Sequence, residues 1–333
     1  MSFRERRQRR QGERKMPRHA HYLPHGVIPA VILPFTDDLA IDEAGFRKHL
    51  RDVTAVEGLS AITINAHSTE VASCSFDEQR RVLDIAQDEI GGRFPIVNGV
   101  WADGSLEAAR IARMAEAGGA SALLVFPPAP FTLGQSPAMA IEHFKRIAEA
   151  TSLPLIAFQY PLSTGQGYPR DTLLRMVDEV PTIRAIKDWC GNVPQHEMHV
   201  RELQSLKRPV NVLSTHSAWL LSSLVLGCNG LLSGSGSVIA DLQAALFRAV
   251  KANDLAEARQ LNDRIYPLAK VFYSEPWADM HNRMKEALVL LGRLPRAVVR
   301  PPLVKITRGE IERIRLALLE AGLLSAKAAR DAA

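Results

Sequence analysis

Cysteine is scarce in this chain of 333 residues, which has three, at positions 74, 190 and 228. Their odd number and unpaired spacing exclude a disulfide-built scaffold, and we expect a reducing, cytoplasmic environment. Apolar runs stay well short of the ~20 residues that a membrane-spanning helix needs, so we expect no membrane partner. Hydrophobic residues make up 47% and charged residues 23% of the chain. This composition excludes a disordered protein and supplies enough apolar surface for a large core.

The excess of positive charge is confined to the N-terminus. The chain carries a net charge of +5, and residues 1–15 alone hold seven basic and two acidic residues. The remainder is therefore neutral, and a basic groove for nucleic acid is not expected in it. We expect residues 1–20 to form a disordered basic tail, residues 326–333 to form a second tail, and nucleic acid not to be a partner.

Short apolar runs rich in β-branched residues alternate with segments of helical periodicity. Strands are expected at residues 27–35, 60–65, 95–100, 121–126, 155–160, 183–188, 209–213 and 230–234. Eight strand–helix alternations predict an α/β fold, the (β/α)8 TIM barrel. An open doubly wound sheet is the alternative, but the glycine fingerprint that usually follows its first strand is missing.

The strand signals stop after residue 254, and three helices are expected at residues 255–270, 280–291 and 308–321. We therefore divide the chain into a barrel over residues 21–240 and a last segment over residues 241–325. That segment holds the final barrel helix and a C-terminal helical domain.

Reactive groups of a TIM barrel lie at the carboxyl ends of its strands. The sixth expected strand ends in Lys187 and Asp188, and an ammonium group is costly to bury there. Either Lys187 extends to solvent or pairs with Asp188, or it is an amine of lowered pKa that attacks a carbonyl carbon and forms a Schiff base.

Two other strand ends carry polar groups. The second ends near His67, Ser68 and Thr69, which form either a carboxylate cradle with a proton carrier or a capped turn. On the fifth strand, Phe158 and Tyr160 share one face. If that face points into the barrel, the Tyr160 phenol lies near Lys187; otherwise it packs at the rim.

Two further patterns are weaker. His196 and His199 stand at i, i+3, which differs from the i, i+4 spacing of zinc proteases, so we interpret them as a solvated helix face and predict no metal site. The glycine- and serine-rich run at residues 233–237 either cradles a phosphate or lines a pocket.

Several motifs in order carry a resemblance to a known family. They are Gly26–Ala30 with Pro34-Phe35, the loop ending in Glu70, Tyr160-Pro161 with Thr164-Gly165, Ala185–Asp188, Gly230–Gly234 and Arg300–Leu303. From His25 to about Leu324 the chain resembles the dihydrodipicolinate synthase / N-acetylneuraminate lyase family of class I aldolases. The resemblance implies a barrel with a three-helix C-terminal domain, a homotetramer built as a dimer of dimers, and Lys187 as the residue that condenses with pyruvate or another 2-oxo acid. It implies a covalent lysine imine and no cofactor.

The chain departs from the family at several functional positions. The loop that usually reads Gly-Thr-Thr-Gly-Glu is here Ala-His-Ser-Thr-Glu, at residues 66–70. Ser68 keeps the hydroxyl of the carboxylate-binding threonine, whereas His67 replaces the threonine of the proton relay. The catalytic tyrosine of strand five aligns with Phe158, the tyrosine pair after strand four with Pro128-Ala129, and the arginine that binds the second carboxylate with Ser163.

These departures shape the expected site. We expect His67, an imidazole that ordinarily titrates near neutrality, to move protons with Tyr160, with His216 as a further candidate. Ser68 and the Thr69 amide are expected to hold the carboxylate, and the backbone around Leu232 and Gly234 to shape the far wall.

The missing arginine, together with Trp101, Phe126 and Trp189 near strand ends, suggests a more apolar second half of the substrate. We therefore predict a Schiff-base lyase, either an aldolase or a dehydratase, acting on a 2-oxo acid or sugar acid but not an authentic dihydrodipicolinate synthase. A catalytically silent relative that binds a 2-oxo acid is the alternative.

Overall fold

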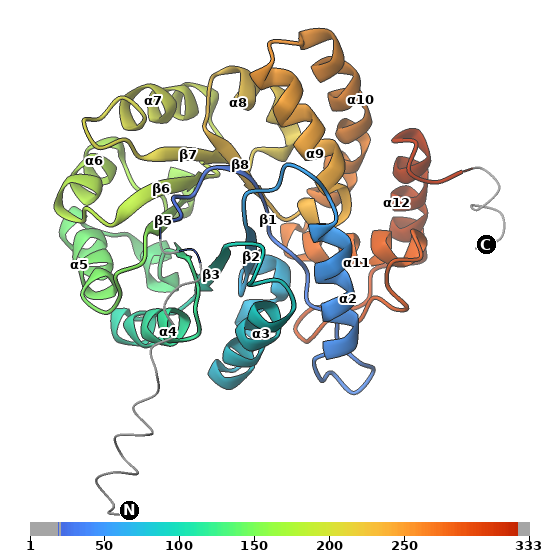
Figure 1. Ribbon diagram of the computed structural model, residues 1–333, viewed down its shortest axis with the longest axis horizontal. Helices are drawn as coiled ribbons and strands as arrows, with labels where there is room; N and C mark the ends of the chain where they lie inside the picture. Colours follow the sequence, from blue (N-terminus) through green and yellow to red (C-terminus); the bar gives the residue numbers. More distant parts are fainter. Residues whose placement is uncertain (1–18, 20, 326–333) are drawn as a thin grey trace, which may run out of the picture.

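Eight parallel strands form a closed barrel in the computed structural model, which describes residue 19 and residues 21–325 (Figure 1). The tails expected at residues 1–20 and 326–333 lie outside the described residues, position 19 excepted. The strands are β1 (Gly26–Pro29), β2 (Ile62–Ile64), β3 (Ile96–Val100), β4 (Ala122–Val125), β5 (Leu155–Gln159), β6 (Ile183–Asp188), β7 (Asn211–Ser214) and β8 (Gly230–Ser233). They pair in the order β1-β8-β7-β6-β5-β4-β3-β2, and bridges from β1 and Ala30 to the β2 segment close the ring. The predicted (β/α)8 fold is confirmed.

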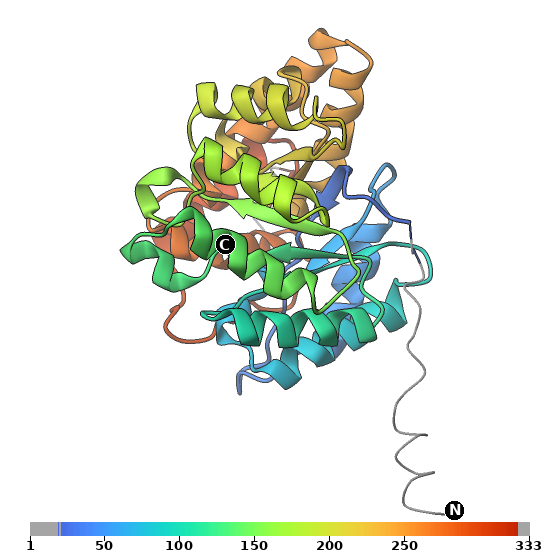
Figure 2. The same ribbon diagram turned by 90° about the vertical axis from the view of Figure 1, so that its left-hand side faces the viewer.

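Helices follow the strands and cover the outside of the barrel, as Figure 2 shows for α4, α5 and α6. They are α2 (Glu43–Thr54), α3 (Phe76–Glu89), α4 (Ser105–Ala117), α5 (Pro137–Ala148), α6 (Arg170–Glu179), α7 (Val193–Leu203), α8 (Leu220–Val225) and α9 (Gly236–Lys251). Helix α3 begins with a capping box, in which Ser75 Oγ accepts from the Glu78 N–H and Glu78 Oε2 accepts from the Ser75 N–H. Such reciprocal bonds satisfy N–H groups that the first helical turn leaves free.

The first strand is shorter than the sequence predicted, since β1 ends at Pro29 whereas an end at residue 35 was expected. Residues 31–33 remain buried, but Pro34 has no N–H to donate to a ladder. Phe35 instead pairs antiparallel with Ile41, which turns the chain toward α2.

Strand alternation separates two apolar cores. One core lies inside the barrel and includes Ile28, Phe158, Ala185 and Leu232, whereas the larger one lies between the strands and the helices. Because side chains alternate along a strand, Lys187 shares the inward face of Ala185, and Asp188 points outward toward the helices.

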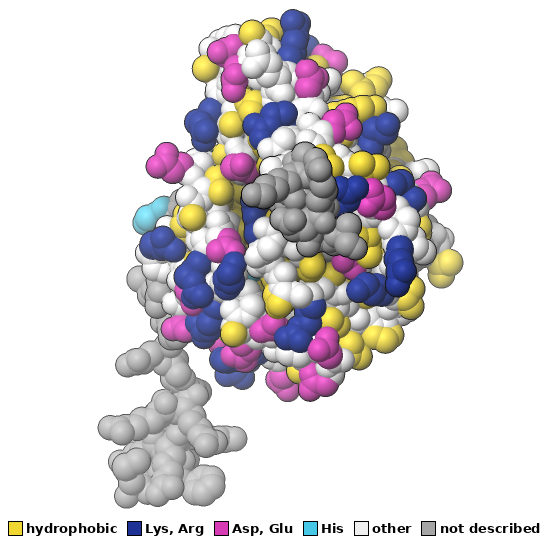
Figure 3. Space-filling model, turned by 90° about the vertical axis from the view of Figure 1, so that its right-hand side faces the viewer, with side chains coloured by type: hydrophobic (Ala, Val, Ile, Leu, Met, Phe, Trp, Pro, Cys, Tyr) yellow, Lys and Arg dark blue, Asp and Glu magenta, His cyan; other side chains and the backbone are white. Residues whose placement is uncertain are grey.

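Three further helices complete the described chain: α10 (Leu255–Phe272), α11 (Met280–Leu290) and α12 (Arg308–Glu320). They gather on one side of the barrel (Figure 1). Figure 3 shows positive and negative side chains interspersed over this side of the molecule. Among the described residues, no helix is both long and apolar enough to cross a membrane.

Candidate active site

Lys187 stands at the carboxyl end of β6 and faces the interior of the barrel. Its side chain is buried, with 7% of the residue exposed, and Nζ lies 4.1 Å from the centroid of the Phe158 ring on the neighbouring strand. No side chain in the described part of the protein forms an ion pair or hydrogen bond with this amine. Burial lowers the pKa of Lys187 to about 7, so an uncharged, nucleophilic amine is well populated near neutral pH.

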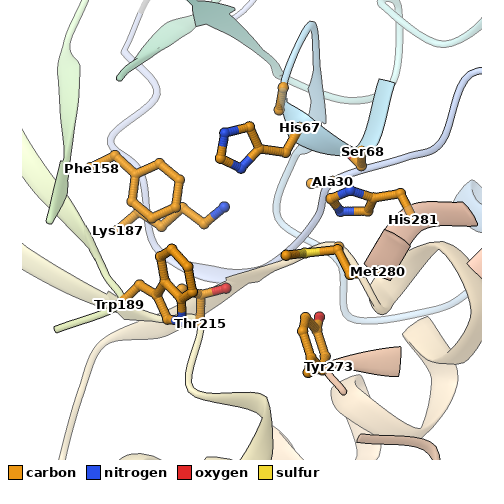
Figure 4. Close-up of a pocket in the computed structure, with 12 residues that line it drawn as sticks. Ala30, His67, Ser68, Phe158, Lys187, Trp189, Thr215, Tyr273, Met280 and His281 are labelled. Carbon is orange, nitrogen blue, oxygen red and sulfur yellow. The ribbon is translucent and has the colours of Figure 1, made fainter. Parts of the chain in front are cut away.

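The amine opens into a pocket that the barrel and the C-terminal helices build together (Figure 4). Lys187 and His67 point into it from different walls, and Ser68 lies beyond His67. The lining residues are Ala30, Ala66, His67, Ser68, Phe158, Lys187, Trp189, Thr215, Gly234, Tyr273, Met280 and His281. Since Tyr273, Met280 and His281 follow the barrel in sequence, the C-terminal segment completes the site.

His67 and Tyr160, two predicted catalytic residues, are brought together. His67 Nε2 lies 3.1 Å from the Tyr160 hydroxyl, and the imidazole packs against Phe126 and Trp101 at centroid distances of 4.8 and 5.1 Å. Burial, and then the charge of Lys187, lowers the pKa of His67 to about 3. The expectation that this imidazole titrates near neutrality is therefore wrong, because aromatic walls exclude the water that would stabilise its cation.

Ser68 and Thr69 follow β2 in a 3₁₀ turn over His67–Thr69. Ser68 Oγ is buried, lines the pocket and has no hydrogen-bond partner among the described residues. The Thr69 amide, in contrast, donates to the Ala66 carbonyl at 3.1 Å, and its hydroxyl donates to the same oxygen at 2.9 Å. Thr69 is therefore engaged in the turn, and its amide is not available to hold a carboxylate.

The two residues expected at the far wall differ in position. Leu232 packs in the core inside the barrel and is not among the lining residues. Gly234 lines the pocket, and a Cβ at this position would lie 2.7 Å from His281 Nε2. Glycine here allows α11 to approach the end of β8 closely.

A buried ion pair, which the sequence did not predict, ties the second-strand loop to the C-terminal segment. Glu70, whose φ is +52°, accepts a hydrogen bond from Lys285 Nζ and another from the Arg300 N–H at 2.9 Å. Lys285 Nζ also donates to the Val298 carbonyl at 2.7 Å. Glu70 and Arg300 lie in sequence motifs that resemble those of the family, and these motifs could have indicated their role. No motif indicated a role for Lys285.

The interpretation of His196 and His199 as a solvated helix face is wrong, because α7 packs this face against the outward side of β6. Both histidines are buried, and their Nδ1 atoms lie 2.8 and 2.7 Å from Asp188 Oδ2. His216, a further candidate for proton transfer, also faces Asp188, at 3.7 Å, and is not among the pocket-lining residues.

Comparison with known proteins identifies the group to which this arrangement belongs. The model of the dihydrodipicolinate synthetase family matches residues 23–321. The chain belongs to this family. Members are class I aldolase-type lyases, and the chain is accordingly an enzyme of that type.

Relatives match over nearly their whole length. The 4-hydroxy-tetrahydrodipicolinate synthase of Methanopyrus kandleri is 29% identical over 300 residues, 90% of this chain and 97% of the relative. That of Persephonella marina is 30% identical over 300 residues, 90% and 99% of the two chains. Among solved structures, YagE, a prophage protein of the dihydrodipicolinic acid synthase family from E. coli K12 in complex with pyruvate, has a TM-score of 0.84. It is 23% identical, with 91% of this chain and 100% of YagE covered. This likeness shows the shared fold.

Proposed function

We propose that the protein is a Schiff-base lyase that acts on pyruvate or another 2-oxo acid or sugar acid through Lys187, without a further cofactor. The observation that carries this proposal is a buried amine that faces a pocket and has no ion-pair partner in the described chain. An amine held in this way serves as a nucleophile toward a ketone. Lys285, which is also buried, is hydrogen-bonded to Glu70 and the Val298 carbonyl.

We propose covalent steps in which Lys187 is the nucleophile. The lone pair of Lys187 Nζ attacks the ketone carbon, and the carbonyl oxygen takes a proton and becomes the hydroxyl of a carbinolamine. Loss of this hydroxyl as water leaves a protonated imine, which accepts the electron pair released when a carbon–carbon bond breaks or a proton leaves the adjacent carbon. Tyr160 and His67, hydrogen-bonded at 3.1 Å, supply and remove these protons, with the imidazole working between neutral tautomers.

Ser68 is the group that we propose for the substrate carboxylate. Its Oγ is buried at the pocket wall with no partner in the described protein, and a buried hydroxyl without a partner is costly. Donation to a carboxylate oxygen would satisfy it and hold the 2-oxo acid in front of Lys187.

The second half of the substrate is proposed to be apolar. A neighbouring pocket shares His67, Met280 and His281 with the first, and most of its remaining lining is apolar: Val71, Ala72, Trp277, Ala278, Pro302 and Leu303, beside Glu70 and Ser73. No arginine lines either pocket among residues 21–325, so a second carboxylate lacks the bidentate partner that would offset its desolvation. Authentic dihydrodipicolinate synthesis is therefore expected to be weak or absent.

Trapping with borohydride tests the covalent proposal. Incubation with pyruvate and a panel of 2-oxo acids, followed by reduction and mass spectrometry, should add one reduced ligand to the wild type and none to Lys187→Ala. An exposed-lysine control, Lys207→Ala, should be labelled like the wild type. Equal labelling of Lys187→Ala, or no labelling of the wild type by any 2-oxo acid, contradicts the proposal.

Turnover of the panel separates catalysis from silent binding. Condensation of pyruvate with an apolar aldehyde should exceed condensation with aspartate semialdehyde, and the reverse order would overturn the proposed specificity. Thermal stabilisation by 2-oxo acids without any turnover would favour the alternative, a catalytically silent protein that binds a 2-oxo acid. This alternative is considered because Phe158 stands where the family has its catalytic tyrosine.

The resemblance also leads us to propose a homotetramer, and the scarcity of cysteine a cytoplasmic location. The end of the strand signals leads us to propose a C-terminal segment that starts near residue 240, a position inside α9 (Gly236–Lys251). Light scattering of the purified protein tests the tetramer, and limited proteolysis of the full chain tests the division.

A further inference from the structure

Three ligand atoms of different chemistry converge behind the pocket wall, on the outward side of β6. They are Asp188 Oδ1, Cys190 Sγ and His216 Nε2, and they all lie within 4.8 Å of one another. The three residues are buried, with exposures of 0%, 4% and 3%. Asp188 and Cys190 come from the end of β6, and His216 follows β7.

The spacing of these atoms is close to that of ligands around one metal ion. His216 Nε2 lies 3.7 Å from Asp188 Oδ1 and 3.8 Å from Cys190 Sγ, and the nitrogen–oxygen separation is too long for a hydrogen bond. Tetrahedral zinc with bonds of about 2.0 Å to nitrogen and oxygen and about 2.3 Å to sulfur places such atoms roughly 3.3 and 3.6 Å apart. For the two pairs that include His216, displacements of a few tenths of an ångström would complete this geometry, and Cys190 Sγ, which lies within 4.8 Å of the carboxylate, would move toward it on binding.

The donor set favours zinc over harder cations. Thiolate and imidazole are ligands that Zn²⁺ prefers, whereas Mg²⁺ and Ca²⁺ select oxygen. The Cys190 thiol donates to the Asn192 carbonyl at 3.3 Å and would release its proton to solvent when the metal binds. The resulting thiolate, one carboxylate and one neutral imidazole then balance the charge of Zn²⁺.

Neighbouring groups already orient two of the ligands. Asp188 Oδ2 is held by His196 Nδ1 at 2.8 Å and His199 Nδ1 at 2.7 Å. Asp188 Oδ1 accepts a hydrogen bond from the Cys190 N–H at 2.9 Å and keeps a second lone pair on the side of His216. The His216 ring stacks on Trp219 with a centroid distance of 3.9 Å and an interplanar angle of 21°. Hydrogen bonds of the kind made by Asp188 are what ligating carboxylates in proteins usually have.

We propose that Asp188, Cys190 and His216 bind one Zn²⁺ ion, which joins the ends of β6 and β7. The role is structural, because Lys187 points to the opposite face of β6, and a water molecule would take the fourth position of the ion. Trp189 lies between two of the ligands in sequence, Thr215 precedes the third, and both line the pocket. The ion therefore holds the wall of the active site in place. This assignment is independent of the substrate and of imine formation.

Metal analysis of the full-length protein tests the site. After expression with added zinc and desalting, the wild type should contain about one zinc ion per chain. Cys190→Ser and His216→Gln should lose it. Cys74→Ser, which changes another buried free cysteine, should retain it. Retention of zinc by Cys190→Ser and His216→Gln would overturn the assignment.

Cobalt supplies a readout that does not depend on how well the variants fold. Titration of chelator-treated wild type with Co²⁺ should produce the near-ultraviolet thiolate-to-metal absorption band, and Zn²⁺ should displace it with submicromolar affinity. Chelator should also lower the unfolding temperature of the wild type and of Cys74→Ser. A wild type that binds neither ion, or that binds cobalt without a thiolate band, would refute the site.

Discussion

Replacing Lys187 by methionine should stabilise the folded protein while removing its activity. The pKa of Lys187 falls from 10.5 to about 7 because burial penalises the ammonium. Between these pH values the unfolded chain binds more protons at this residue than the folded chain, so this residue makes folding more favourable as pH rises. Methionine has a similar volume and carries no charge, and the variant lacks this dependence.

The magnitude follows from the size of the pKa shift. At about 1.4 kcal/mol per pH unit, Lys187 costs the wild type about 4 kcal/mol at pH 7 relative to an uncharged side chain, and almost nothing above pH 10.5. The variant also loses the favourable contact between Nζ and the Phe158 ring, which reduces its gain in stability by about 1 kcal/mol. We therefore expect Lys187→Met to gain about 3 kcal/mol in free energy of unfolding at pH 7.

Urea unfolding of both proteins at several pH values between 6 and 10.5 measures this difference. The gap should be largest at pH 7 and below and should close toward pH 10.5. Lys207→Met, at an exposed position, should show no comparable gain. A Lys187→Met variant that is no more stable than the wild type at pH 7, or a gap that does not change with pH, would refute the description of a buried, uncompensated amine.

Two further substitutions and one pH profile probe the site. Tyr160→Phe removes the hydroxyl beside His67 and should lower kcat about 100-fold, with trapping of pyruvate retained; an unchanged kcat would exclude the proposed relay. Lys285→Met leaves Glu70 charged and buried and should cost about 3–5 kcal/mol in urea unfolding, part of which Glu70→Gln in the same chain should restore; additive losses would contradict the ion pair. The rate of borohydride-trapped adduct formation should rise with pH through about 7, as Lys187 loses its proton, and a rise centred near pH 10 would show a solvated amine.

Local patterns predicted the fold well because each element carries its own signal. The capping box of α3 lies within four residues, Ser75–Glu78, and strand alternation alone places Lys187 on the face of Ala185. The first strand was overextended because Val31–Leu33 are as apolar as a strand, while the chain leaves the ladder at Pro34.

The site was predicted less completely because it depends on contacts between distant segments. Met280 and His281 close the pocket from α11, and no periodicity links them to Lys187. His67 and Tyr160 were identified as neighbours of the lysine through strand ends, but the imidazole's low pKa arises from aromatic rings on other strands. Cys190 and His216 meet only through the pairing of β6 with β7.

Peptide mapping of wild-type protein reduced with borohydride in the presence of pyruvate tests the central claim most directly, because residues 21–325 include two buried lysines to distinguish. We expect the added mass of one reduced pyruvyl group on the peptide that contains Lys187, with Lys285 unmodified. An adduct on Lys285 or on a surface lysine, with Lys187 recovered intact, would contradict the account.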